Sequence, residues 1–230
     1  MQYHVGTSGF SYDEWRPAFY PEDLKKAAML SYYAGQLPAV ELNNTFYRMP
    51  AEKAVRTWSE QVPDSFRFAI KASRRLTWSQ KLVDCGELLD YLFGALRPLG
   101  DKLGCVFYQL PKYVRCDVDV LRAFLAEQPE GVRAAFEFAH PSWHVDEVFD
   151  LLHERGATVV ASDKDDEDEP VLRPGAPWIY LRLRRAAYDD DVLRAWRDRI
   201  AELGVSDAFV FFKHEDSCAG PALARRFLDL

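Results

Sequence analysis

Short apolar runs, rich in β-branched and aromatic residues, recur along the chain roughly every 30 residues. They are apolar at consecutive positions, as strands of a parallel sheet are when helices cover one face and a barrel interior lies against the other. The pattern therefore predicts eight strands, over residues 3–6, 39–42, 66–71, 104–110, 133–138, 157–162, 178–183 and 208–213.

Most segments between these runs carry apolar residues at helical spacing, most clearly the leucine-rich segment 87–96. Pro21 suits the first turn of a helix, and Gly156 and Gly204 suit the left-handed position after a helix end. We expect helices over residues 21–36, 51–61, 87–96, 118–126, 145–155, 189–203 and 221–230.

The segment between the sixth and seventh runs breaks this rhythm. Residues 163–177 contain Pro170, Pro174, Gly175 and Pro177, which oppose a long helix. The order of elements therefore predicts an α/β fold, a single TIM-like (β/α)8 barrel over residues 1–230 with a shortened sixth crossover. An open doubly wound sheet is the alternative, although the G-T-S-G at 6–9 lacks the glycine spacing of a dinucleotide-binding turn.

Composition narrows the class of protein. Hydrophobic residues make up 48% of the 230 positions and aromatic residues 14%, which excludes a disordered chain. The net charge of −7 opposes a surface that coats nucleic acid. Since no apolar run approaches the ~20 residues of a membrane span and no secretory signal begins the sequence, we expect a cytoplasmic protein without membrane contact.

The acidic excess is concentrated in residues 163–169, where six acids accompany one lysine. This segment directly follows the sixth predicted strand, at the end of the barrel where function resides. We expect a solvated acidic loop at the rim, with a cation-binding lid as the alternative.

Charged and polar residues gather where the predicted strands end. The candidate catalytic residues are Glu41, Lys71, Glu137, His140, Arg182 and His214. The two glutamates would exchange protons with a substrate, the lysine and the arginine would stabilise developing charge, and either histidine would shuttle a proton. Because lone charges are costly to bury, the same residues could instead form an ion-pair network that holds the barrel closed.

Aromatic and polar residues beside these strand ends indicate a binding site for a flat or hydroxyl-rich ligand, such as a sugar or a nucleobase. Basic residues after the seventh and eighth strands would bind an anion there. The candidate substrate-binding residues are Ser8, Trp15, Asn43, Phe46, Tyr47, Gln109, Trp143, Arg184, Lys213 and Glu215. The alternative for the aromatic rings is that they close the top of a short barrel.

The sequence gives little support to a metal or redox centre. The four cysteines form no C-x-x-C pair, and we interpret them as small core residues. Oxygen and imidazole ligands occur near the strand ends, at Glu137, His140, His144, Asp163 and Glu215, but without a metal-binding spacing. We therefore expect no cofactor, with a metal as the alternative.

Several ordered motifs resemble the domain of unknown function 72 family, also called YecE-like. They are G-T-S-G-F-S-Y at 6–12, E-L-N-N-T-F-Y at 41–47, F-A-I-K at 68–71, Q-L-P at 109–111 and H-P-S-W at 140–143. The resemblance implies a TIM-like barrel and no established reaction. The chain departs from the family pattern at Ala139, where the family has arginine, and at Arg184–Arg185, where it has histidine and glycine.

These observations favour a hydrolase- or lyase-like enzyme that acts on a polar sugar- or phosphate-bearing small molecule at the C-terminal face of the barrel. The alternative is a non-catalytic module that binds a metabolite or a nucleic-acid end. The expected partner is a small anionic or sugar-like molecule, nucleic acid is disfavoured, and the oligomeric state is left open.

Overall fold

Eight parallel strands form a closed ring in chain order, with β8 pairing back to β1. The structure is a computed structural model that describes residues 1–165, 167–213 and 218–230. The strands are β1 (Gln2–Ser8), β2 (Ala39–Leu42), β3 (Arg67–Lys71), β4 (Leu103–Leu110), β5 (Ala134–Phe138), β6 (Thr158–Asp163), β7 (Trp178–Leu183) and β8 (Asp207–Phe212). The predicted TIM-like barrel is confirmed, and the open sheet is excluded.

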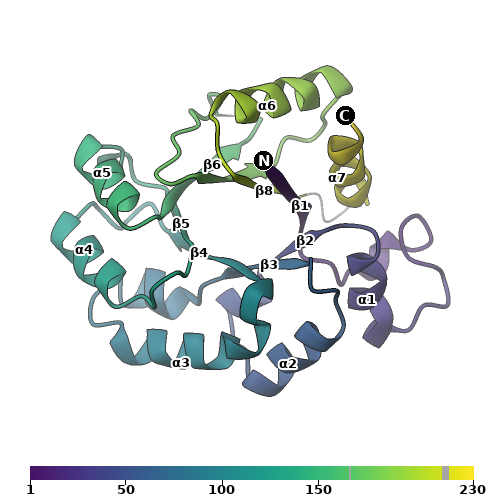
Figure 1. Cartoon of the computed structure of the whole chain (residues 1–230), viewed down its shortest axis with the longest axis horizontal. Helices are drawn as coiled ribbons and strands as arrows, with labels where there is room; N and C mark the ends of the chain where they lie inside the picture. The colour runs from purple at the N-terminus through teal and green to yellow at the C-terminus, as the bar shows by residue number, and fades with distance from the viewer. Residues whose placement is uncertain (166, 214–217) are drawn as a thin grey trace.

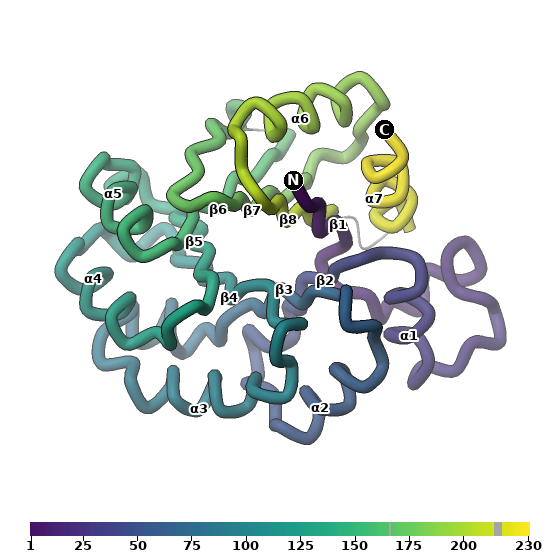
Figure 2. The backbone as a smooth tube through the Cα atoms, in the orientation of Figure 1, coloured from purple at the N-terminus to yellow at the C-terminus, as the bar shows by residue number. Residues whose placement is uncertain are grey.

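Helices lie around the outside of this ring (Figures 1 and 2). The apolar clusters on the two sides of the ring contain different residues. The α-helices are α1 (Met29–Ala34), α2 (Glu52–Glu60), α3 (Gly86–Leu96), α4 (Val118–Ala126), α5 (Asp146–Glu154), α6 (Asp190–Glu202) and α7 (Ala219–Asp229). In β8, Phe209 and Phe211 belong to the cluster inside the barrel, while Val210 and Phe212 belong to the cluster under the helices. This division explains why the strands are apolar at consecutive positions.

Two helix boundaries differ from those predicted. The expected helix over 21–36 is α-helical only over Met29–Ala34, after a 3₁₀ turn at Lys26–Ala28. The carbonyl of Leu24 accepts a hydrogen bond from Arg16 instead of closing a helical turn. The last helix begins at Ala219, so Pro221 lies inside its first turn, where a missing N–H has no cost.

The barrel wall is incompletely paired between β5 and β6. Only two residue pairs join these strands, Ala135 with Thr158 and Phe136 with Val159, whereas six join β7 to β8. Glu137 and Phe138 therefore have no pairing partner on β6. The described part of the β6–β7 connection contains no helix, which confirms the shortened sixth crossover.

Asp165, Glu167, Asp168 and Glu169 are exposed, as expected for a solvated acidic loop, but the segment is also held to the barrel at several points. Asp163 is fully buried and accepts hydrogen bonds from Arg185 and Tyr188. Asp165 accepts from the backbone of Ala186, and Glu169 pairs with Arg199 of α6. The charges are paired because arginines of the β7–α6 region face this segment, a pairing between distant segments that local composition does not reveal.

Candidate functional site

A layer of polar side chains closes the barrel interior at the C-terminal ends of the strands. The interior below it is apolar, and includes Ala39, Ala69, Phe107, Ala135 and Tyr180. Because side chains alternate along a strand, the residue two positions further on also points inward. Those residues are Glu41, Lys71, Gln109, Glu137 and Arg182, with Ser162 and Lys213 in the corresponding positions of β6 and after β8. Four of the predicted catalytic residues, Glu41, Lys71, Glu137 and Arg182, thus share one layer.

Arg182 joins two carboxylates across the barrel. Its side chain is almost completely buried, and its two terminal nitrogens lie 3.0 Å from Glu41 Oε1 and 2.9 Å from Glu137 Oε2. The guanidinium also lies over the Phe107 ring, 4.9 Å from its centre. Burial by itself would lower the pKa of Arg182, but the two carboxylates raise it above its ordinary value. Arg182 therefore stays charged and holds both glutamates in place.

Glu41 is a fixed anion. Its Oε1 accepts hydrogen bonds from Ser8 at 2.7 Å and Asn43 at 2.9 Å besides that from Arg182. Its Oε2 accepts a 2.7 Å hydrogen bond from Tyr180. Burial alone would raise the pKa of Glu41, yet Arg182 and the hydroxyls of Tyr180 and Ser8 lower it to about 2. With both oxygens occupied, Glu41 is suited to hold Arg182 rather than to move protons.

Among the described residues, hydrogen bonds reach only one of the two carboxylate oxygens of Glu137. Its Oε2 accepts hydrogen bonds from Gln109 Nε2 and from Arg182, both at 2.9 Å. Its Oε1 lies 4.0 Å from Arg184, beyond hydrogen-bonding distance. One oxygen thus fixes the carboxylate and the other is available to a ligand.

Lys71 has no carboxylate partner among the residues that the structure describes, although two carboxylates occupy the same layer. Its Nζ lies 4.4 Å from the centre of the Phe46 ring and 5.5 Å from that of Phe107. Burial lowers the pKa of Lys71, Arg182 lowers it further, and the resulting value is about 8. A substantial fraction of this amine is therefore neutral near physiological pH.

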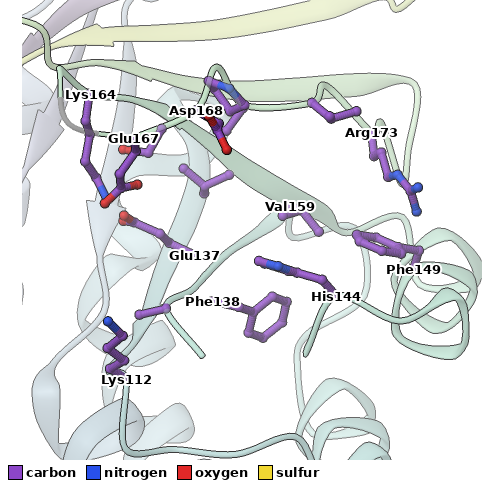
Figure 3. A pocket seen from close by; sticks show the side chains of 16 residues that line it. Lys112, Glu137, Phe138, His144, Phe149, Val159, Lys164, Glu167, Asp168 and Arg173 are labelled. Carbon is purple, nitrogen blue, oxygen red and sulfur yellow. The ribbon is translucent and has the colours of Figure 1, made fainter. Parts of the chain in front are cut away.

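A cavity of about 580 Å³ opens beside this layer, at the incompletely paired β5–β6 junction (Figure 3). Glu137 lines it from the barrel interior, and Phe149 and Arg173 line its outer part. Lys112 and Lys164 lie on opposite sides of Glu137 in this view (Figure 3). Lys71 and Arg182 are not part of this cavity wall, so Glu137 is the residue common to the charged layer and the cavity.

Exposed aromatic rings flank the other side of the mouth. Phe46, which lies under Lys71, contacts Trp78 edge-to-face at 5.3 Å between ring centres. Trp78 in turn contacts Tyr113, and Tyr47 is 73% exposed. These rings provide an apolar surface next to the polar layer, suited to stacking with a flat ligand.

Four other predicted site residues lie away from the charged layer or outside the described part. Trp15 is 1% exposed and packs among Tyr12, Phe19 and Tyr20, and Trp143 is equally buried against Phe138. Both therefore belong to the core that closes the top of the barrel. His214 and Glu215 lie outside the described residues.

His140 and the residues after β7 and β8 lie close to the site without forming its centre. The Nδ1 of His140 accepts a 3.1 Å hydrogen bond from the backbone N–H of Ser142 and so caps the 3₁₀ turn Pro141–Trp143. Arg184 approaches Glu137, and Lys213 is close enough to Lys71 to lower its pKa further. Within the described residues, no group of three or more His, Cys, Asp or Glu side chains is arranged to hold a metal ion.

Sequence reasoning missed Tyr180 and Phe107, which contact the charged residues directly. The available signal was alternation: Tyr180 lies two residues before Arg182, and Phe107 two before Gln109. Asp163, in contrast, faces away from the barrel interior, because it is one residue out of phase with Ser162.

A family model described as "Protein of unknown function DUF72" matches residues 4–230. The chain belongs to the DUF72 family. This membership confirms what the ordered motifs from residue 6 to residue 143 indicate.

Curated proteins that are similar to this chain include YecE and YunF. The UPF0759 protein YecE of Escherichia coli strain K12 is 30% identical over 140 residues, and the UPF0759 protein YunF of Bacillus subtilis strain 168 is 26% identical over 149 residues. The matched regions cover 58% and 61% of this chain. They cover 52% and 51% of those relatives, so the chain spans about half the length of the curated relatives it matches.

Solved structures of DUF72 proteins share the fold over nearly the whole chain. The crystal structure from Thermotoga maritima has a TM-score of 0.79 at 25% identity and covers 99% of this chain and 97% of that one. A structure from Enterococcus faecalis has a TM-score of 0.81 at 18% identity, covering 100% and 96%. Among the described residues of this DUF72 chain, no helix is long and apolar enough to cross a membrane.

Proposed function

We propose that this DUF72 barrel is a hydrolase- or lyase-like enzyme acting on a polar, sugar- or phosphate-bearing small molecule at the C-terminal face. The observation that supports this most is the state of Glu137. One of its oxygens is fixed by Gln109 and Arg182, while the carboxylate lines a cavity of about 580 Å³. A carboxylate that is oriented on one side and accessible on the other is the arrangement expected of a general acid or base.

The other charged residues would have distinct parts in this reaction. Arg182 would orient Glu137 and stabilise negative charge, because it is permanently charged and held by two carboxylates. Glu41 would hold Arg182 and would not itself transfer protons, which revises the acid–base role expected from its position in the sequence.

The surroundings favour a substrate with both an anionic and a flat or hydroxyl-rich part. Arg184 lies near the accessible oxygen of Glu137, and Lys112, Lys164 and Arg173 line the cavity. The rings of Tyr47, Trp78 and Tyr113 are exposed on the other side of the mouth. Basic side chains bind phosphate or carboxylate groups, and aromatic faces bind sugar rings.

The test compares wild type with Glu137→Gln and with Glu202→Gln, a control in which an exposed carboxylate at the end of α6 is replaced. Each protein is incubated with a small-molecule fraction of cell extract, and consumed and bound compounds are identified by mass spectrometry. We expect the wild type and Glu202→Gln to consume the same compound, and Glu137→Gln to lose turnover by about 100-fold or more. Equal consumption by all three proteins would contradict the proposal.

The same experiment recognises a non-catalytic binding module, which the exposed aromatic rings at the mouth would suit. In that case a compound is retained in native mass spectra but is not consumed. Replacement of Trp78 by alanine would then weaken retention, whereas Glu137→Gln would leave the bound compound chemically unchanged.

A further inference from the structure

Lys71 differs from Glu41, Glu137 and Arg182 in the polar layer, because it has no ion-pair partner within the described residues. Glu41, Glu137 and Arg182 are linked to one another at 2.9–3.0 Å. Lys71 projects into the same layer but meets two aromatic rings, those of Phe46 and Phe107. A lysine whose function was to neutralise Glu41 or Glu137 would lie against a carboxylate.

The arrangement disfavours the ammonium form of Lys71 by two separate effects. The rings and the surrounding barrel exclude water from its side chain, and Arg182 places a permanent positive charge in the same layer. Desolvation and a neighbouring cation are the two means by which proteins generate a neutral, nucleophilic lysine amine. Glu41 and Glu137 only partly oppose this, because both are engaged by Arg182.

We propose that Lys71 is a nucleophile that forms a covalent imine with an aldehyde or ketone group of the substrate. This inference rests on the proposed function and deepens it, since it names the reacting group of the substrate as a carbonyl. The anionic part of such a carbonyl compound would lie toward Arg184 and Lys213, which follow β7 and β8.

Imine formation needs only Lys71, Glu137 and the carbonyl group of the substrate. The Lys71 ammonium gives one proton to the Glu137 carboxylate, by way of the ligand or an intervening water. The nitrogen lone pair then attacks the carbonyl carbon, a C–N bond forms, and the C=O electron pair moves to oxygen. Glu137 returns its proton to that oxygen and takes another from nitrogen. It finally protonates the hydroxyl, which leaves as water while the nitrogen lone pair forms the C=N bond. Ammonium and carbonyl thus give iminium and water.

Reductive methylation tests this inference without knowledge of the substrate. Formaldehyde is itself an aldehyde, and cyanoborohydride reduces the imine that it forms with an amine. The rate of methylation of each lysine is measured at pH 7.5 by peptide mass spectrometry, with exposed Lys53 on α2 as the internal reference. At this pH a pKa of about 8 at Lys71 gives a neutral fraction about 200-fold above that of an ordinary lysine. Half-burial slows access, so we expect Lys71 to be methylated at least about tenfold faster than Lys53.

Variants separate a nucleophilic role of Lys71 from an electrostatic one. Lys71→Arg keeps the positive charge but cannot form an imine, so turnover of the compound identified under the proposed function should be lost with it as with Lys71→Met. Methylation of Lys71 no faster than that of Lys53, or full turnover by Lys71→Arg, would overturn the inference.

Failure of the inference and failure of the proposed function give different results. Loss of turnover in Glu137→Gln, together with methylation of Lys71 in the wild type no faster than that of Lys53, leaves the enzyme proposal in place and removes the imine. Fast methylation of Lys71 with unchanged turnover in Glu137→Gln would instead retain the reactive lysine and contradict the role of Glu137.

Discussion

At the scale of single residues, the mouth of the barrel contains two opposite electrostatic situations. Glu41 is buried with four hydrogen bonds and is stabilised as an anion. Lys71 is partly buried without an ion pair in the described part of the chain, so its charge is disfavoured. The ion-pair and hydrogen-bond partners of a residue therefore distinguish a stabilising role from a reactive one, although Glu41 and Lys71 are both charged and both lie at strand ends.

Replacing Lys71 by methionine should stabilise the protein. At neutral pH the folded state holds a partly desolvated ammonium, and a side chain of similar volume without charge removes that penalty. We expect the free energy of unfolding in urea to rise by about 1–3 kcal/mol at pH 7. Lys53→Met, at an exposed site, is the control and should change it by less than about 0.5 kcal/mol. A destabilised Lys71→Met would show that the lysine holds the barrel together.

Glu41 should make stability depend on acidity. Its folded-state pKa of about 2 lies below the unfolded value of 4.5, so its contribution is fully present above pH 4.5 and is lost as the pH falls toward 2. The shift corresponds to about 3 kcal/mol. Urea unfolding of wild type and Glu41→Gln from pH 6 to pH 3 should therefore show a difference in stability that shrinks toward acid. A difference independent of pH would contradict this assignment.

The sequence could predict the fold and the position of the candidate site as far as the periodicity of apolar residues shows where strands begin and end. The positions of Glu41, Lys71, Glu137 and Arg182 at the ends of predicted strands indicate that they lie together at one end of the barrel. An ion-pair network among these residues was one of the two predictions, but the sequence could not show that Arg182 pairs with both glutamates while Lys71 pairs with neither, because this depends on which strands face each other across the ring. The burial of Trp15 and Trp143 could not be predicted either, because it depends on long-range packing: an aromatic residue after a strand can close the core or line a cavity.

At the scale of elements, the β6–β7 connection takes the place of a helix. The segment that follows β6 is anchored by Asp163 to Arg185 and Tyr188 and by Glu169 to Arg199. These contacts fix it across the junction where β5 and β6 share only two residue pairs. The cavity beside Glu137 thus has a wall made of loop rather than helix.

Neutralising Asp163 should destabilise this connection. Asp163→Asn leaves the guanidinium of Arg185 beside a buried amide and removes a charge-assisted hydrogen bond. We expect a loss of about 1–3 kcal/mol in the free energy of unfolding. Asp168→Asn, on the exposed part of the same segment, should have an effect below about 0.5 kcal/mol. Equal effects of the two substitutions would show that Asp163 contributes no anchoring.

At the scale of the whole molecule, the strands of the ring are unequally paired. β1–β8 and β7–β8 each have six residue pairs, whereas β1–β2 has three and β5–β6 has two, the fewest of these. The net charge of −7 does not describe the charge at the mouth of the barrel. There, four basic residues lie near two glutamates: Lys71, Arg182, Arg184 and Lys213.

Hydrogen exchange should locate the β5–β6 junction. Peptides that cover β5 and β6 should exchange their amide hydrogens faster at neutral pH than the peptide covering β8, because fewer pairs must open. The measurement is exchange followed by mass spectrometry on the native protein. Protection of β6 equal to that of β8 would show that the junction is closed in solution.

The open junction gives a closed barrel something that closure normally removes, namely strand edges. Unpaired edges invite strands of other chains, and proteins protect them with charges and prolines. The segment after β6 carries both: acidic residues from Asp163 to Glu169, and Pro170, Pro174 and Pro177. We expect the acidic residues and prolines of this segment to disfavour pairing with strands of other chains at the β5–β6 junction.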